Sequence, residues 1–136
     1  RYHLTAVGVS YDDVSANTKN VTCTGWVQRD EVFRFYRDAD VVIMPSRWES
    51  FGLVAIEAFS CGVPVIASNI CAFPEIIDHG ENGFLFENGS FDSLKSCILQ
   101  LDNINLLQFS QKAREKVESS FSITTMQNKI FNTYEA

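Results

Sequence analysis

The feature that most constrains the fold is a run of four apolar residues, Val41 to Met44, followed by a polar loop and then an apolar helix. A short continuous apolar run predicts a strand buried on both faces, as in a parallel sheet covered by helices. The helix is predicted from Gly52 to Ser60, with Ser50 as its N-terminal cap and Gly62 and Pro64 as stop signals. We expect the chain to be organised around this strand, loop and helix.

The rest of the chain repeats the alternation of strands and helices. This alternation predicts an α/β fold of Rossmann-like type, a doubly wound parallel sheet with helices on both faces. The further strands are predicted at Tyr2 to Val9, Val21 to Thr24, Val63 to Ala67 and Gly83 to Phe86. Further helices are predicted at Asp30 to Asp38, from Pro74 onward, and from a Ser90 cap to about Leu101. The remainder, from Asn105 onward, is predicted as two helices that separate near Ser119 to Phe121.

Charge and cysteine content exclude several function classes. The net charge is −6 and no basic cluster occurs, so binding of nucleic acid through phosphate neutralisation is not expected. No apolar run is long enough to span a bilayer, and any contact with a membrane surface is expected to come from parts of the protein outside this chain. The four cysteines form no C-x-x-C pair and only two histidines are present, so no metal site is predicted and the thiols are expected to be free in a reducing cytoplasm.

Two glutamates of the central unit are candidate ligand-binding residues. Glu49 lies in the loop at the carboxyl end of the predicted strand, where open α/β sheets bind ligands, and Glu57 lies about two turns into the helix. Between Glu49 and Glu75, Glu57 is the only charged residue. A buried carboxylate needs hydrogen-bond donors, and the two hydroxyls of a ribose would supply them. The alternative is that Glu57 sits at the solvent edge of the helix.

Gly52 is a second indication of ligand binding. A glycine in the first turn of a helix costs about 1 kcal/mol relative to alanine, so its presence needs a reason. Without a side chain here, an anion can reach the amides of Phe51, Gly52 and Leu53, which carry partial positive charge. A sugar nucleotide fits this set, with its diphosphate on the amides beside Ser50, its sugar near Glu49 and its ribose farther along the helix.

Three motifs follow one another through the middle of the chain. They are Ser46-x-x-Glu49-x-Phe51-Gly52-Leu53-x-x-x-Glu57-Ala58, Cys61-Gly62-Val63-Pro64-Val65-Ile66-Ala67-Ser68 and Pro74-Glu75-Ile76-Ile77. In this order and spacing they resemble the group 1 (family 4-like) retaining glycosyltransferases, which have the GT-B fold of two Rossmann-like domains facing across a cleft. Residues 1–136 resemble the C-terminal, nucleotide-sugar-binding domain of that fold.

The resemblance implies a hexosyltransferase of polysaccharide biosynthesis. Such an enzyme moves a sugar from a nucleoside-diphosphate sugar to an acceptor glycan or lipid-linked sugar, with retention at the anomeric carbon. The nucleotide sugar is a substrate and no cofactor or metal is implied. The location implied is cytoplasmic, peripheral at the inner membrane, and the acceptor is expected to bind through an N-terminal domain that this chain lacks.

The resemblance also implies a role for each site residue. Glu49 is the catalytic residue, which holds the donor sugar and stabilises the positive charge that develops at its ring. The amides of residues 51–53 stabilise the leaving diphosphate, and Glu57 holds the ribose. Trp26 and Val27 lie against the nucleobase, although packing of Trp26 between domains or under a loop is an equal alternative.

Two departures from the family pattern qualify these expectations. Cys71 and Ala72 occupy places where the family usually has glycines, which is expected to tune specificity. The chain also begins at Arg1, where the resemblance places the second strand of the domain. In the strand order 3-2-1-4-5-6 the missing first strand is central, so the chain is interpreted as a segment of a longer protein that is inactive in isolation.

Two other functions remain open for the same fold. A nucleotide-sugar epimerase would need no sugar acceptor, and a non-catalytic nucleotide-binding module would tolerate changes at Glu49. A dinucleotide-dependent dehydrogenase is disfavoured because no G-x-G-x-x-G motif follows the first predicted strand.

Overall fold

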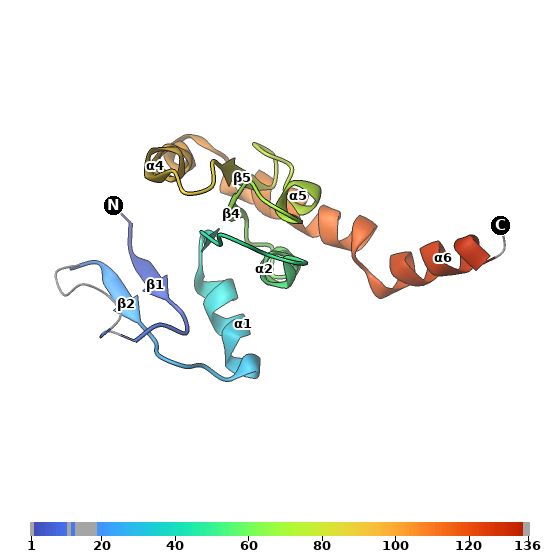
Figure 1. The fold of residues 1–136 in the computed structure, drawn as a ribbon, viewed down its shortest axis with the longest axis horizontal. Coiled ribbons are helices and arrows are strands. Elements are labelled where there is room, and N and C mark those ends of the chain that lie inside the picture. The colour runs from blue at the N-terminus through green and yellow to red at the C-terminus, as the bar shows by residue number, and fades with distance from the viewer. Residues whose placement is uncertain (1, 11, 13–18, 135–136) are drawn as a thin grey trace. The chain divides into compact units, whose positions relative to one another are not determined.

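A computed structural model describes residues 2–10, 12 and 19–134 of the chain. It consists of two compact units, Arg1–Asp38 and Ala39–Ala136, each of which has its own parallel sheet (Figure 1). The predicted α/β class with parallel strands and helices is confirmed. The expected single sheet is instead present as two sheets, and no pairing joins them among the described residues.

The first unit contains β1 (Leu4–Ala6), β2 (Val21–Cys23) and α1 (Arg29–Asp38). The two strands pair in parallel, with Leu4 opposite Val21 and Ala6 opposite Cys23. Strand β1 is shorter than the predicted Tyr2 to Val9 because the chain turns at Gly8, whose φ of 82° lies in the left-handed region. The loop from β2 to α1 carries Trp26 and Val27.

The second unit is a three-stranded parallel sheet in the order β3 (Val42–Met44), β4 (Val65–Ser68) and β5 (Gly83–Phe86). All four residues of the central strand β4 are buried, whereas in β3, for which the sequence predicts burial on both faces, only Met44 is fully buried. Its helices are α2 (Leu53–Ser60), α3 (Phe73–Ile76), α4 (Phe91–Gln100), the short 3₁₀ helix η2 (Leu101–Asn103), α5 (Leu106–Ser120) and α6 (Ile123–Tyr134).

Helices cover both faces of this sheet. On one face Ile66, Phe84 and Phe86 form a core with Cys97 of α4 and Phe109 of α5. Side chains alternate along a strand, so Val65 and Ala67 point to the opposite face, where α2 contacts β3 and β4. Val65 and Ala67 have no exposed surface, so this second face is closely packed over the central strand.

Several local signals act as predicted. Helix α2 ends in a Schellman motif around Gly62, whose φ is 76°, with Gly62 N–H donating to Phe59 O (2.8 Å) and Val63 N–H to Ala58 O (3.0 Å). The Ser90 hydroxyl accepts from the Ser93 amide at 3.2 Å and caps α4. The last two helices separate where predicted, between Ser120 and Ile123.

The start of α2 differs from the prediction. The helix begins at Leu53, its N-cap residue is Gly52, and no side chain caps it, so the prediction of a Ser50 cap is wrong. Gly52 also lies outside the first turn, with φ 75° and ψ 31°. The glycine is explained by this left-handed backbone, which other residues adopt only at a cost of roughly 1–2 kcal/mol.

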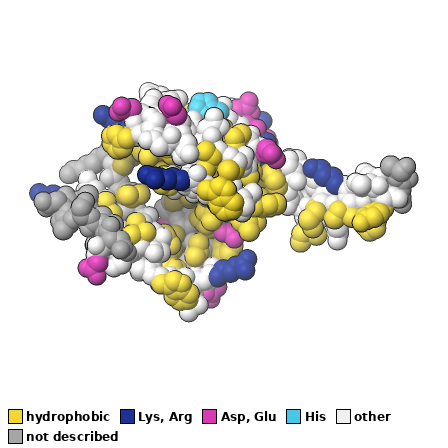
Figure 2. Space-filling model, viewed as in Figure 1, with side chains coloured by type: hydrophobic (Ala, Val, Ile, Leu, Met, Phe, Trp, Pro, Cys, Tyr) yellow, Lys and Arg dark blue, Asp and Glu magenta, His cyan; other side chains and the backbone are white. Residues whose placement is uncertain are grey.

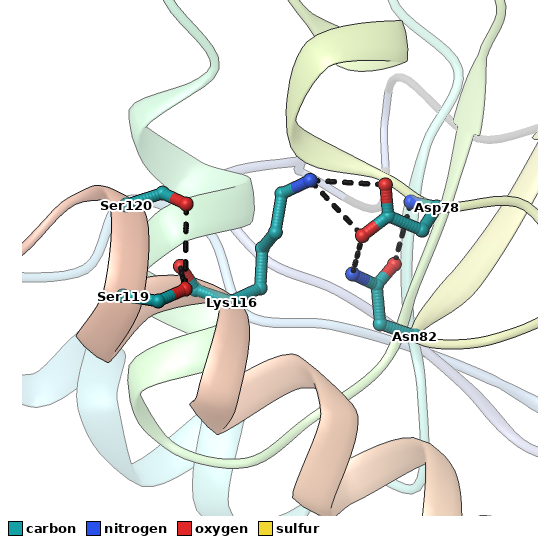
Figure 3. Close-up of polar contacts among 5 residues, drawn as sticks. All are labelled: Asp78, Asn82, Lys116, Ser119 and Ser120. Carbon is teal, nitrogen blue, oxygen red and sulfur yellow. Dashed lines mark hydrogen bonds and ion pairs between the residues drawn. The ribbon is translucent and has the colours of Figure 1, made fainter.

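A cluster of polar side chains links α5 to the loop before β5 (Figure 3). The Asp78 carboxylate accepts from Lys116 Nζ at 2.9 and 3.0 Å and from Asn82 Nδ2 at 3.3 Å. Asn82 Oδ1 in turn accepts from the Asp78 amide at 2.9 Å, and Asn82 is only 1% exposed. All these groups are satisfied within the protein, so the cluster is a structural link and not a candidate site.

Helix α6 carries an exposed apolar stripe (Figure 2). Its large apolar side chains recur at helical spacing and remain 48–86% exposed. None of the described helices is both long enough and apolar enough to cross a membrane. The stripe consists of Ile123, Met126, Ile130, Phe131 and Tyr134.

Candidate functional site

The candidate site lies in the second unit, at the edge of the sheet where parallel strands β3 and β4 end. The loop after β3 carries residues 45–52 and the loop after β4 carries residues 69–72. A hydrogen bond from the buried Ser68 hydroxyl to the Ser46 carbonyl joins the two loops. This is the edge at which open α/β sheets bind ligands, as the sequence predicts for Glu49.

The Glu49 carboxylate bends back onto the start of α2. Its Oε1 accepts from the amide of Phe51 at 3.3 Å and from the amide of Gly52 at 3.2 Å. These are two of the three amides that the sequence assigns to a diphosphate. They are therefore occupied by an oxygen of the protein itself, and an anion can reach them only if Glu49 rotates away.

Two further amides at the start of α2 have no acceptor among the described residues. Leu53 and Val54 begin the helix, and the first amide that bonds backward is that of Ala55, to Gly52 O at 3.0 Å. Unpaired amides at a helix start carry partial positive charge. The start of α2 thus combines two amides bonded to a carboxylate with two that point outward.

Glu57 lies one turn after Leu53 and is half-buried. Residues four apart share a face of a helix, and side chains lean toward its N-terminus. Glu57 is therefore on the face of α2 that carries Leu53, with its side chain leaning toward the amides. The predicted contact of Glu57 with a ribose stays a prediction.

Trp26 and Val27 belong to the first unit, in the loop between β2 and α1. Trp26 is 78% exposed and Val27 is half-buried. Trp26 is therefore not packed beneath a loop of the described residues, which was one of its predicted alternatives. Its predicted contact with a nucleobase stays a prediction.

A pocket of about 310 Å³ opens beside the Glu49 loop. It is formed by the loops after β3 and β4 together with the ends of α3 and α5. The sequence motifs include Ser50, Phe51, Glu75 and Ile76, but no sequence pattern predicts that these residues share a pocket with Phe121. The lining residues are Ser50, Phe51, Cys71, Ala72, Glu75, Ile76 and Phe121.

Cys71 has an unusual backbone conformation at the wall of this pocket. Its φ is 49°, and it is the one residue other than glycine with a positive φ in the described part of the chain. Such a conformation costs a residue with a side chain roughly 1–2 kcal/mol. Ala72 has an ordinary φ of −77°, so of the two departures from the family's glycines only Cys71 occupies a position that favours glycine.

The described residues contain no group of three or more histidine, cysteine, aspartate or glutamate side chains that could hold a metal ion. The named residues of the site offer amide donors, the carboxylates of Glu49, Glu57 and Glu75, the Ser50 hydroxyl, the Cys71 thiol and aromatic rings. Amide donors suit an anion, and carboxylates suit hydroxyl groups.

The chain is similar to several known proteins. The family model "Glycosyl transferases group 1" matches residues 15–118. The chain is 35% identical over 141 residues to an uncharacterised 41.2 kDa protein in the cps region of Klebsiella pneumoniae, covering 100% of this chain and 38% of the relative. It is 30% identical over 117 residues to the UDP-Gal:alpha-D-GlcNAc-diphosphoundecaprenol alpha-1,3-galactosyltransferase of Escherichia coli, covering 85% of this chain and 30% of that enzyme.

A solved structure has the same fold. HepE from Anabaena, in complex with UDP, superposes with a TM-score of 0.71 and 26% identity over 85% of this chain and 32% of HepE. The chain therefore covers between 30% and 38% of the length of these proteins.

Proposed function

This chain belongs to the group 1 glycosyltransferases, and from that premise we propose that it is the donor-binding domain of a retaining hexosyltransferase. The donor is a nucleoside-diphosphate sugar and the acceptor is a glycan or a lipid-linked sugar. A relative that uses UDP-Gal and a diphosphoundecaprenol-linked sugar, and a similar structure that binds UDP, support this choice.

The observation that carries the proposal is the position of Glu49 at the start of α2. Its Oε1 lies 3.2–3.3 Å from two amide nitrogens, which is where an oxygen of an anion would lie. A diphosphate oxygen replaces this carboxylate on the amides of Phe51 and Gly52, and the adjoining amide of Leu53 adds a third donor. The exchange frees the Glu49 carboxylate to accept hydroxyl groups of the donor sugar.

The remaining contacts follow from the same pose. The ribose lies along α2, where Glu57 accepts its two hydroxyls. During transfer, the bond between the anomeric carbon and the diphosphate oxygen breaks, the acceptor oxygen bonds to that carbon on the same face of the ring, and the proton of the acceptor hydroxyl passes to the leaving diphosphate. Glu49 stabilises the positive charge at the ring, while the amides stabilise the negative charge on the leaving diphosphate.

Calorimetric titration of the chain with UDP, GDP, ADP and inorganic pyrophosphate tests the donor site. We expect one nucleoside diphosphate to bind. Glu57→Gln should weaken its binding about 10-fold, the effect of a charged hydrogen bond, and leave pyrophosphate unchanged because pyrophosphate has no ribose. Glu118→Gln is the matched control, since Glu118 is an exposed glutamate on α5.

If a diphosphate oxygen displaces the Glu49 carboxylate from the amides, removing that carboxylate should strengthen the binding of a diphosphate. Glu49→Ala should strengthen binding of the nucleoside diphosphate roughly 5-fold, because like charges about 4 Å apart repel by about 1 kcal/mol in water. The same variant should lose the extra affinity that the sugar of the nucleotide sugar provides. Absence of binding by every diphosphate, or equal weakening of pyrophosphate in Glu57→Gln, would refute the proposed donor site.

A further inference from the structure

Two asparagines of this chain are followed directly by glycine, in the pairs Asn82-Gly83 and Asn88-Gly89. Such a pair is chemically labile, because glycine has no side chain that keeps its amide nitrogen away from the asparagine carboxamide. The proposed donor site uses neither pair. The structure places the two pairs in opposite surroundings, and this difference predicts which of them reacts.

The pair Asn82-Gly83 is buried and held in place. Asn82 is 1% exposed, its Oδ1 accepts from the Asp78 amide at 2.9 Å, and its Nδ2 donates to Asp78 Oδ2 at 3.3 Å. Gly83 begins β5 opposite Val65, so closely that an added Cβ would fall 2.1 Å from Val65 O. The Asn82 carboxamide can therefore approach the glycine amide only if two hydrogen bonds break and the start of β5 moves.

The pair Asn88-Gly89 is exposed in the loop between β5 and α4. Neither the Asn88 carboxamide nor the Gly89 amide makes a hydrogen bond to any residue that the structure describes. The two residues are the centre of a turn that the Ser90 amide closes by donating to Glu87 O at 3.0 Å. An added Cβ at Gly89 would meet no atom within 4 Å, so there is room for a ring to form here.

We infer that Asn88 is a site of spontaneous deamidation and that the fold protects Asn82 from the same reaction. The Gly89 amide nitrogen attacks Asn88 Cγ, so that a new C–N bond forms and the bond to the side-chain nitrogen breaks. Ammonia leaves with the proton of the Gly89 amide, and a five-membered cyclic imide remains. Water then opens the imide at either carbonyl, which gives aspartate or isoaspartate, and no other reactant is consumed.

The two products change the turn in different ways. Both add one carboxylate to a chain whose net charge is already −6. Aspartate leaves the main chain unchanged, and its charge lies near the start of α4, where a negative charge is favourable. Isoaspartate adds one carbon to the main chain before Gly89. The bonds from the Ser90 amide to Glu87 O and from the Glu87 amide to Ser93 Oγ, at 2.9 Å, depend on the original spacing, so isoaspartate should loosen the connection from β5 to α4.

Incubation of the folded chain in a mildly alkaline buffer tests the inference. Timed samples are cleaved after glutamate, and deamidation is located by tandem mass spectrometry. Glu81 and Glu87 directly precede the two asparagines, so the two sites fall on separate peptides. Asn88 should react at least about 10-fold faster than Asn82, because two hydrogen bonds worth about 1 kcal/mol each must break before Asn82 can react.

The same chain unfolded in urea is the control. Both pairs are free there, so their rates should become similar. Equal rates in the folded chain would overturn the inference, and so would an Asn88 that stays intact in the folded chain while it reacts in urea. Asn88→Gln should remove the signal at residue 88, because the longer side chain must close a less favourable six-membered ring.

The products give a second test. Isoaspartate is detected with an isoaspartate-specific carboxyl methyltransferase and labelled S-adenosylmethionine, and the label should appear at residue 88. Formation of aspartate alone would refute the cyclic imide. The isoaspartate form, separated by ion exchange, should unfold at a lower urea concentration than Asn88→Asp, which has the same charge without the additional carbon. Equal midpoints would refute the loosening of the turn.

Discussion

Replacing Gly52 by alanine should destabilise the second unit more than replacing a glycine whose positive φ is its only constraint. Gly52 has φ 75°, and a Cβ there would fall 2.6 Å from Ile76 Cδ1 and 3.5 Å from Phe73 Cδ1 and Cε1. Phe73 is fully buried and Ile76 is 2% exposed. A Cβ at 2.6 Å is closer than real contacts allow, so the Ile76 side chain must shift within its packed surroundings.

The expected magnitude has three contributions. The left-handed backbone costs an alanine about 1–2 kcal/mol. Overpacking against Ile76 adds about 1–3 kcal/mol. Alanine also reduces the conformational entropy of the unfolded chain, which offsets about 0.4–1 kcal/mol of this cost. Gly52→Ala should therefore lower the free energy of unfolding by about 2–4 kcal/mol.

Gly89→Ala is the matched control. Gly89 has φ 78°, and a Cβ there would meet no atom within 4 Å, so this variant has the backbone cost alone, about 1 kcal/mol. Urea denaturation followed by circular dichroism measures both variants against the unchanged chain. If the two variants differ by less than about 0.5 kcal/mol, close packing at Gly52 does not explain this glycine.

Two other variants and one pH dependence can be measured by the same denaturation assay. Asn82→Ala should cost about 1–3 kcal/mol because it leaves the part-buried amide of Asp78 without its acceptor. Lys116→Met should cost less than about 1 kcal/mol because its ion pair with Asp78 is partly exposed. The reverse order would contradict the hydrogen-bond assignments. Burial raises the pKa of the Cys97 thiol above its ordinary value of 9.0, so the unfolded chain releases this proton first and the stability should fall as the pH rises past 9. Cys97→Ala should flatten that fall, and alkylation at pH 9 should modify Cys71 long before Cys97; equal alkylation rates would contradict the burial.

Much of the second unit could be predicted because its signals are local. The residues from Val63 to Ala67 predicted the strand β4, and Gly62 and Ser90 predicted a helix end and a helix start that the structure confirms. The start of α2 could not be predicted in the same way. Both Ser50 and Gly52 are acceptable N-cap residues, and the left-handed backbone at Gly52, together with the packing of Ile76 beneath it, selects the glycine.

The candidate site, too, could be predicted only in part. The motifs placed Glu49 at the carboxyl end of β3, which the structure confirms, but not the bonds from its carboxylate to the amides of Phe51 and Gly52. A side-chain torsion decides whether that carboxylate faces the amides or the solvent, and no sequence pattern specifies it.

By itself, the sequence determined the alternation of strands and helices, the family and the loop that carries the candidate site, because periodicity, stop residues and motifs are properties of neighbouring residues. The tertiary structure alone decided which oxygen occupies the amides of α2 and that Glu75 and Phe121 share a pocket with Ser50. These residues are far apart along the chain and meet only when the strands pair in parallel and α5 packs against α2, so their contact depends on long-range packing that no local pattern encodes.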